Sequence, residues 1–191
     1  MAYYSRVSAM ALVLLVISCA GSNFIRPESE SLSLKQTTKQ DITNKFGKPY
    51  QKGTKLTNEK TVDFVTYAYS SVGSNPVYEG ITPARAMTFY FLNDLLVGYD
   101  FTSTFKEDHS DFDESKLNII KKGETSLEDV ISALGEPKGK YIFPLIEDAE
   151  SEAVVYKYEQ FKSYKIYNKS LIITANQGIV TDVEYITSGE K

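Results

Sequence analysis

The sequence is poor in the residues that carry most enzyme chemistry. Its 191 residues include one cysteine, one histidine and no tryptophan. A single cysteine excludes an internal disulfide and any site built on several cysteines, and a single histidine excludes a multi-histidine metal centre. No Gly-rich phosphate loop, nucleophile motif or calcium-loop spacing is present. We therefore expect a protein that is not an enzyme and that uses no metal and no small-molecule cofactor.

Positive charge is also in short supply. The chain has 21 Lys and Arg against 25 Asp and Glu, a formal net charge of -4. A nucleic-acid-binding protein would normally carry a basic stripe, so we expect no nucleic-acid partner. Hydrophobic residues at 42% and charged residues at 24% are typical of a globular chain and exclude wholesale disorder.

The N-terminus has the pattern of an export signal. One charge, Arg6, precedes a short apolar run over residues 9–17, which is too short for a comfortable membrane span. The run ends in Val16-Ile17-Ser18-Cys19, which resembles the lipobox of bacterial lipoproteins. That resemblance implies removal of residues 1–18 and attachment of diacylglycerol and acyl chains to Cys19. An uncleaved helix with a buried cysteine is the alternative.

The residues after Cys19 set the expected location of the protein. Residues 19–31 are polar and rich in Ser and Glu, and they indicate a lipidated tether. The resemblance implies a protein anchored in the cell envelope through membrane lipid, at the outer membrane facing the periplasm.

A thirteen-residue pattern occurs twice in the body of the chain, at 37–49 and at 125–137. The shared positions are Thr37 and Thr125, Asp41 and Asp129, Gly47 and Gly135, and Pro49 and Pro137. Each Thr is an N-cap candidate, with Gln40 or Glu128 completing a capping box. Each Gly fits a helix end that needs positive φ, and each Pro forbids continuation. Each copy therefore predicts one short helix.

Strand patterns follow both copies. They lie at 62–69, 86–92 and 95–102 in the first, and at 153–159, 164–175 (broken near Asn168) and 179–186 in the second. With a further helical turn before each helix, the order is helix, helix and three strands, twice. We expect an α+β fold of tandem αα-βββ units, a two-layer sandwich of helices packed on antiparallel sheet. The expected units are repeat 1 (32–105), an acidic linker (106–113) and repeat 2 (114–191).

The second copy carries a family resemblance. Residues 123–137, with Gly123, Thr125, Val130, Leu134 and Pro137, resemble the signature of the SmpA/OmlA (BamE-like) outer-membrane lipoprotein family. The tandem arrangement is similar to that of the β-lactamase inhibitory proteins. The resemblance implies a non-catalytic scaffold that binds an envelope protein, in outer-membrane protein assembly or envelope maintenance. The alternative is an inhibitor of a periplasmic or extracellular enzyme.

Large apolar side chains suggest where a partner would bind. The candidates are Phe64, Phe89, Phe91, Tyr141 and Phe143. The strands of the first three are apolar on both faces, so either an uncovered face meets a partner or the two sheets continue into each other. The last two lie in a predicted loop over 139–151, which either inserts into a partner or the membrane surface or folds back over a sheet edge. The acidic stretch around His109 is expected to be a solvated linker.

Overall fold

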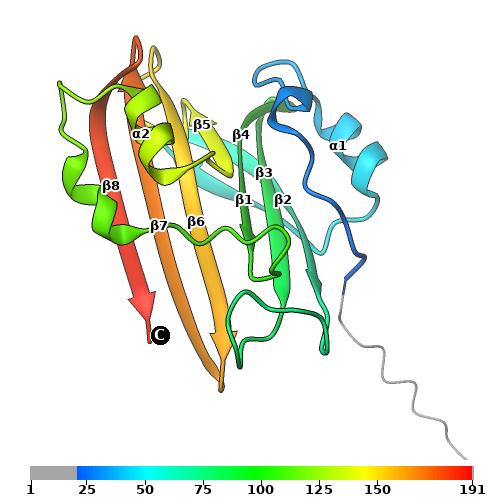
Figure 1. Ribbon diagram of the computed structural model, residues 1–191. Coiled ribbons are helices and arrows are strands. Elements are labelled where there is room, and N and C mark those ends of the chain that lie inside the picture. The colour runs from blue at the N-terminus through cyan, green and yellow to red at the C-terminus, as the bar shows by residue number, and fades with distance from the viewer. Residues whose placement is uncertain (1–20, 191) are drawn as a thin grey trace, which may run out of the picture.

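One antiparallel sheet of eight strands, hydrogen-bonded in chain order, organises the protein (Figure 1). The computed structural model describes residues 21–190, so Cys19 and the predicted export signal lie outside the described residues. The strands are β1 (Gln51–Thr57), β2 (Lys60–Ser70), β3 (Ala84–Leu92), β4 (Leu95–Ser103), β5 (Gly139–Ile142), β6 (Glu152–Lys162), β7 (Lys165–Asn176) and β8 (Ile179–Gly189). The helices are α1 (Lys39–Phe46) and α2 (Leu127–Leu134), with 3-10 turns η1 (Ser29–Ser31) and η2 (Glu114–Ile119). Over residues 21–190, no helix combines the length and the apolar character that crossing a membrane requires.

The expected α+β sandwich of two helix-covered sheets is wrong. Each half of the chain contributes four strands instead of three, because β1 and β5 were not predicted. The short strand β5 pairs with β4 on one side and with β6 on the other, so the two halves form a single sheet. The α-helices have eight residues each, too few to cover a layer of this width. The fold is therefore a mainly antiparallel β structure with two small helical covers.

Four tight turns fix the register of the hairpins. Both central residues have positive φ at Asn58-Glu59, Asn93-Asp94, Ser163-Tyr164 and Gln177-Gly178. Such two-residue turns match the right-handed twist of the strands that they join. The turns after β3 and β7 agree with the predicted turn positions, whereas the break expected near Asn168 is absent, because β7 pairs with both neighbours through that residue.

Both α-helices begin one residue later than the repeat predicts. The N-caps are Thr38 and Ser126, and each forms a capping box with the aspartate three residues on, Asp41 or Asp129. The N-cap role predicted for Thr37 and Thr125 is therefore wrong, as is the pairing with Gln40 and Glu128. The hydroxyls of Thr37 and Thr125 instead accept hydrogen bonds from the backbone N–H of Ser33 and of Lys121, which closes the turn before each helix.

The two helix ends are held in the same way. Gly47 and Gly135 have φ of 76° and 82°, and each donates its N–H to the carbonyl four residues earlier. The carbonyl of Gly47 accepts a hydrogen bond of 3.0 Å from the Tyr67 hydroxyl, and that of Gly135 accepts one of 2.8 Å from Tyr156. Pro49 and Pro137 follow two residues later. Each helix is thus tied at its C-terminus to the second strand of its own half.

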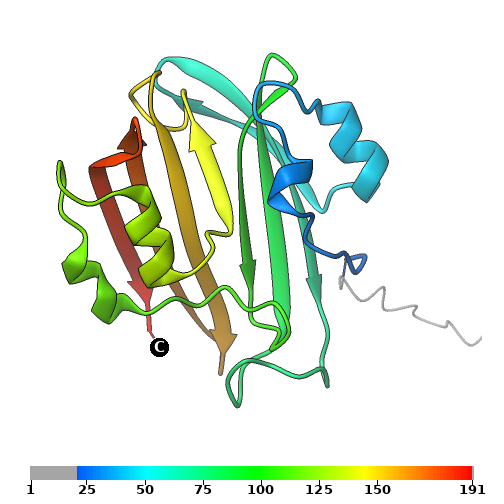
Figure 2. The ribbon, with the colours of Figure 1, turned by 45° about the horizontal axis from the view of Figure 1, so that its top comes forward.

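Each half has a hydrophobic core on the same face of the sheet, which we call the helix face (Figure 2). Under α1, Ile42 meets Met87, Phe89 and Phe101. Under α2, Val130 meets a second set that includes Val154, Tyr156, Leu171 and Ile173. The register joins the two cores, since Tyr99 pairs with Lys140 and Lys140 with Val154.

Replacement of Gly135 by valine is expected to destabilise the second half. Its φ of 82° is a conformation that β-branched residues avoid, so we expect a loss of about 1–2 kcal/mol and a melting temperature lower by several degrees. Thermal unfolding followed by circular dichroism measures the change. Ser132→Val is the control, because it places the same side chain at an exposed position of α2 with ordinary helical backbone and should cost less. Equal melting temperatures for Gly135→Val and the parent would contradict this role.

Candidate binding face

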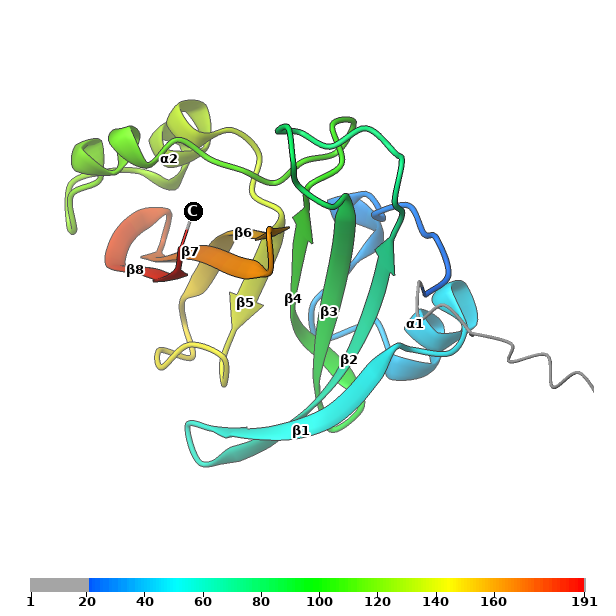
Figure 3. The same cartoon turned by 90° about the horizontal axis from the view of Figure 1, so that it is seen from below.

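The face opposite the helices is concave and carries no helix, although Leu145 packs against Val62 and Val97 on it. The sheet bends between β4 and β6, and α1 and α2 both lie outside the bend (Figure 3). The hydrogen-bonded register places Thr66, Thr88 and Asp100 on the inner face of the first half, and it continues through Tyr141 onto β6. We call this surface the open face. No helix occupies it, so part of it is available to a partner.

A buried carboxylate lies at the centre of the open face, beside the bend. Asp100 in β4 is 2% exposed and accepts hydrogen bonds from the hydroxyls of Tyr90 (2.9 Å) and Tyr141 (2.5 Å). It also forms an ion pair of 3.0 Å with the ammonium of Lys157 in β6. The side chain of Lys157 remains 35% exposed. A fixed positive charge is thus presented on the concave surface, with its counter-charge beneath it.

These contacts shift the ionisation of the groups around Asp100. Its negative charge raises the pKa of Lys157, so the ammonium form is favoured. Burial, followed by the same charge, raises the pKa of the Tyr90 and Tyr141 hydroxyls well above the ordinary value. The raised pKa values keep Lys157 as an ammonium and both phenols neutral at neutral pH. These are groups that bind and orient, and none is placed as a nucleophile beside a base.

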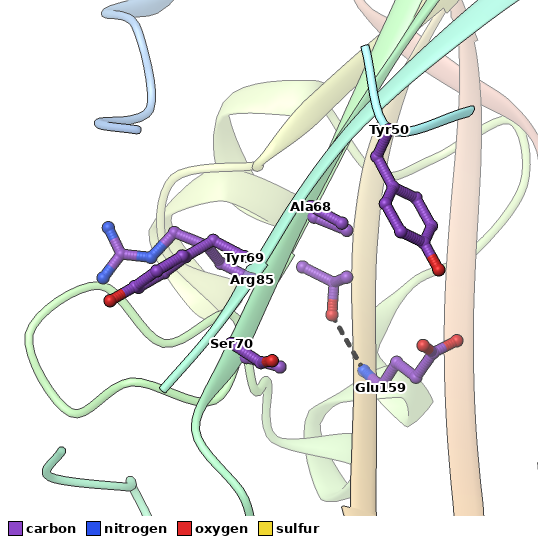
Figure 4. Close-up of a pocket in the computed structure, with 9 residues that line it drawn as sticks. Tyr50, Ala68, Tyr69, Ser70, Arg85 and Glu159 are labelled. Carbon is purple, nitrogen blue, oxygen red and sulfur yellow. Dashed lines mark hydrogen bonds between the residues drawn. The ribbon is translucent and has the colours of Figure 1, made fainter. Parts of the chain in front are cut away.

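Below the end of β5, side chains join β4 directly to β6. The N–H of Glu159 donates to the hydroxyl of Thr102 (2.9 Å), and the hydroxyl of Ser110 donates to the carbonyl of Lys157 (2.6 Å). Beside these contacts lies a hollow of about 200 Å³, whose lining includes Tyr50, Ala68 and Glu159 (Figure 4). Tyr50 and Glu159 flank it, while the side chains of Tyr69 and Arg85 point to the opposite side of the sheet.

Exposed apolar side chains gather at the lower end of the second half. Phe161 (44% exposed) and Ile166 (54%) are cross-strand partners, and Phe161 lies edge-on to Tyr164 (95%) at the hairpin tip. Ile186 (51%) lies on the open face opposite Ser170. Exposed aromatic and aliphatic groups beside a fixed charge are typical of protein-binding surfaces.

The structure distributes the predicted partner-binding residues over different environments. Phe89 and Phe91 are 0% and 1% exposed in the core of the helix face, so their assignment as partner residues is wrong: alternation directs them under α1. Phe64, on the open face, packs its ring over Gly53 of β1 and is half-buried. Tyr141 and Phe143 are also half-buried, Tyr141 within β5 instead of a loop. These last three remain predictions for partner contact.

The acidic linker is not a freely solvated segment. Phe112 is 7% exposed and Ser110 4%, and the carboxylates of the segment are held by two buried cations. Arg85, 8% exposed, pairs with Glu107 (2.9 Å) and Asp108 (3.0 Å). The solvation expected from composition fails because buried charges elsewhere need these acids as partners.

The second buried cation, Lys169, has an environment like that of Arg85. Lys169 lies in β7, the third strand of its half, as Arg85 lies in β3. It is 2% exposed and pairs with Asp111 at 2.7 Å, and its ammonium lies 4.3 Å from the ring centroid of Phe112. The guanidinium of Arg85 lies 4.2 Å from the ring centroid of Phe105. Each half therefore clamps one end of the linker with a cation, a carboxylate and an aromatic ring.

His109 does not join a catalytic group in the described part of the chain. It lines a polar hollow of about 480 Å³ with Tyr78, Asp111 and Lys169, on the side of the linker. The Tyr78 hydroxyl donates to Asp111 at 2.6 Å, and this bond, with burial, raises the pKa of Tyr78 to about 12. Among residues 21–190, no cluster of His, Cys, Asp and Glu is arranged to hold a metal ion.

Asp100 and Lys157 were missed as a pair, although the sequence contains a signal for each. Asp100 interrupts the apolar run of β4, and Lys157 occurs between two buried tyrosines in β6. A charge in an otherwise apolar strand needs a partner when it is buried. The pairing itself depends on β5, which separates the two strands along the chain and brings them together in the sheet.

Comparison with known proteins adds little. No family model matches the chain, and no curated protein matches it. The SmpA/OmlA resemblance thus rests on its motif alone. A solved structure from Streptococcus mutans, which carries the provisional name beta-lactamase inhibitor protein, aligns over 82% of this chain and 91% of its own, with 13% identity and a TM-score of 0.40. Similarity at this level carries no argument about what this chain binds.

Proposed function

We propose that this protein is a non-catalytic binding module that recognises a partner protein through the open face of its sheet. The observation that carries the proposal is the fixed centre of that face: the ammonium of Lys157, whose side chain is 35% exposed, is held by Asp100, which is 2% exposed. Charged groups whose geometry is set before binding lose little entropy on complex formation. The exposed apolar groups Phe161, Tyr164 and Ile186 supply the remaining contact area.

The location of the module follows from the lipobox. We propose that Cys19 carries acyl chains and holds the body at a bacterial membrane, within the periplasm. Anchoring confines the module to a thin layer, which raises its effective concentration for partners at the same membrane. Cys19→Ala is expected to abolish incorporation of labelled palmitate and to leave an unprocessed precursor. Continued incorporation would contradict lipidation.

Site-specific photo-crosslinking in the native membrane tests the binding face. A photoreactive residue at Ile186 or Tyr164 is expected to give a discrete protein adduct. The same residue at Glu128 or Ser132, exposed on α2 on the opposite side, should not. Lys157→Glu should remove the adduct formed at Ile186. Adducts of equal yield on both sides of the molecule would refute the proposal.

The captured protein distinguishes two roles for the same face. Scaffolding in envelope maintenance or outer-membrane protein assembly predicts a membrane-embedded partner, and a deletion strain with defective barrel proteins. The alternative, inhibition of a periplasmic or extracellular enzyme, predicts a soluble enzyme whose turnover falls when the purified protein is added. Residual turnover at saturating protein would exclude inhibition through the enzyme's active site.

A further inference from the structure

A second feature of the open face has no role in the Asp100 centre. A groove of about 530 Å³ runs over the second half of the sheet, between the β1–β2 turn and the segment that follows β5. Its floor includes Ile172, which the register places opposite Val155 and Glu184 on the open face. Leu145 and Ile146 also line it. The groove is therefore apolar at its base.

The turn that forms one wall is fixed in place. The side-chain amide of Asn58 donates to the carbonyls of Pro144 and Ile146, both at 3.0 Å. The Thr57 hydroxyl donates to the Pro144 carbonyl at 3.2 Å. These bonds join segments more than eighty residues apart and tie the first half of the sheet to the second. The groove is thus a preformed feature, and its shape does not depend on a bound partner.

Carboxylates surround the apolar floor. Glu147, Asp148, Asp182 and Glu184 all line the groove and are exposed, and no lysine or arginine is part of its lining. Asp182 pairs with Lys122. The other three form no ion pair within residues 21–190. Hydrogen bonds from Ser151, the Glu150 N–H and Asn176 hold the pKa of Asp148 below its ordinary value, so it stays ionised at neutral pH.

We propose that this groove binds a basic segment of the partner protein, with lysine or arginine side chains laid along its floor. Their methylene groups fit against Ile172 and Leu145, and their charged ends reach the carboxylates at the rim. A metal ion is a poorer occupant, because the carboxylates of the described chain are not grouped closely enough to ligate one. The inference rests on the proposed function in one respect, since it names the chemistry of the partner.

Carbodiimide coupling to a lysine oligopeptide tests the groove directly. The reagent joins an amine to a carboxylate with no spacer, so mass spectrometry identifies the acids that the peptide touches. Using the full chain in detergent, we expect coupling at Glu147, Asp148 and Glu184 ahead of the other exposed acids. Coupling spread evenly over all exposed acids would overturn the proposal, as would coupling between two copies of the chain through the groove acids.

A pair of charge-reversed variants separates the groove from general attraction. Glu147→Lys/Glu184→Lys is expected to weaken binding of the lysine peptide at least tenfold. The matched control, Glu79→Lys/Glu136→Lys, makes the same change in net charge at exposed residues outside the groove and should have a much smaller effect. All four positions are exposed, so folding should be unaffected, as circular dichroism can verify. Equal losses in both variants would refute the site.

The outcome is independent of the photo-crosslinking experiment. If the lysine peptide does not select the groove while Ile186 still captures a protein, the module binds a partner that is not basic, and only the present inference fails. If the groove binds the peptide while Ile186 and Tyr164 capture nothing in the membrane, the proposed function fails and the basic-segment site remains.

Discussion

Replacing the buried Lys169 of β7 by methionine is expected to cost about 3–5 kcal/mol of unfolding free energy. The side chain is 2% exposed, and its ammonium neutralises Asp111, which is itself only 10% exposed. Methionine fills a similar volume but leaves that carboxylate buried without a counter-charge. The ammonium also donates to the carbonyl of Phe112, so one linker backbone group loses its partner as well.

Urea unfolding of the single and double variants measures this cost and its origin. Lys169→Met/Asp111→Asn removes both charges, and we expect it to recover most of the loss, because two neutral groups are cheaper to bury than one unpaired ion. A single variant within 0.5 kcal/mol of the parent would show that the linker is not clamped by this lysine.

Asp100→Ala is expected to weaken both stability and partner binding. Asp100 is 2% exposed, so its loss leaves the hydroxyls of Tyr90 and Tyr141 without their acceptor and Lys157 without its counter-charge. We expect the unfolding free energy to fall by about 2–4 kcal/mol. The lower end of this range is favoured because the Lys157 side chain can reach water. Photo-crosslinking from Ile186 should fall in parallel, since Lys157 is no longer held in place.

The pKa of Lys157 reports on the ion pair with Asp100 separately from any loss of packing. Asp100 raises the pKa of Lys157 in the folded protein, so this pair stabilises the fold below the ordinary lysine pKa and loses its effect as pH rises through the folded pKa. In Asp100→Asn, which keeps the shape, the pKa of Lys157 should fall and its acylation by an amine-reactive ester at mildly alkaline pH should become faster. An unchanged acylation rate would contradict the ion pair.

The elements with strong local patterns could be predicted from the sequence. Strands such as β2 and β6 alternate, and their buried sets, Val65 with Tyr67 and Val154 with Tyr156, lie under the helices as their spacing indicates. The repeated Gly-x-Pro ends each helix, because positive φ at Gly135 and the missing N–H of proline act within a few residues. These effects need no knowledge of the rest of the chain.

The architecture could not be predicted in the same way. β1 is an edge strand with a polar sequence and mostly exposed side chains, so it lacks the alternation that marks a half-buried strand. β5 has four residues, too few for a period to be visible, yet it joins the two halves. Both omissions led to two sheets where there is one. The assignment of Phe89 and Phe91 to a partner surface had another cause: β3 carries apolar side chains on both faces, so its sequence does not say which face the helix covers.

The candidate site required tertiary contacts that no local pattern encodes. Asp100 and Lys157 are brought together across β5, and Asn58 meets Pro144 through the folding of the second half onto the first hairpin. The clamp by Arg85 and Lys169 likewise depends on the position of each strand beside the linker. In all three cases the charged or amide side chain can be seen in the sequence. The residue that it contacts is determined by the order of the strands in the sheet.

The N-terminal residues of the described chain do not behave as a loose tether. Phe24 packs edge-on against Phe46, its carbonyl accepts a bond from Arg85, and Gly21 lies against the backbone of Ala68 in β2. Four residues lie between Cys19 and Phe24, so the Cα atoms of these two residues can be at most about 18 Å apart. If Cys19 is lipidated, the connection between the lipid and the folded body is therefore short and reaches the body beside β2. β8 would then be the strand farthest in sheet order from the point of attachment beside β2.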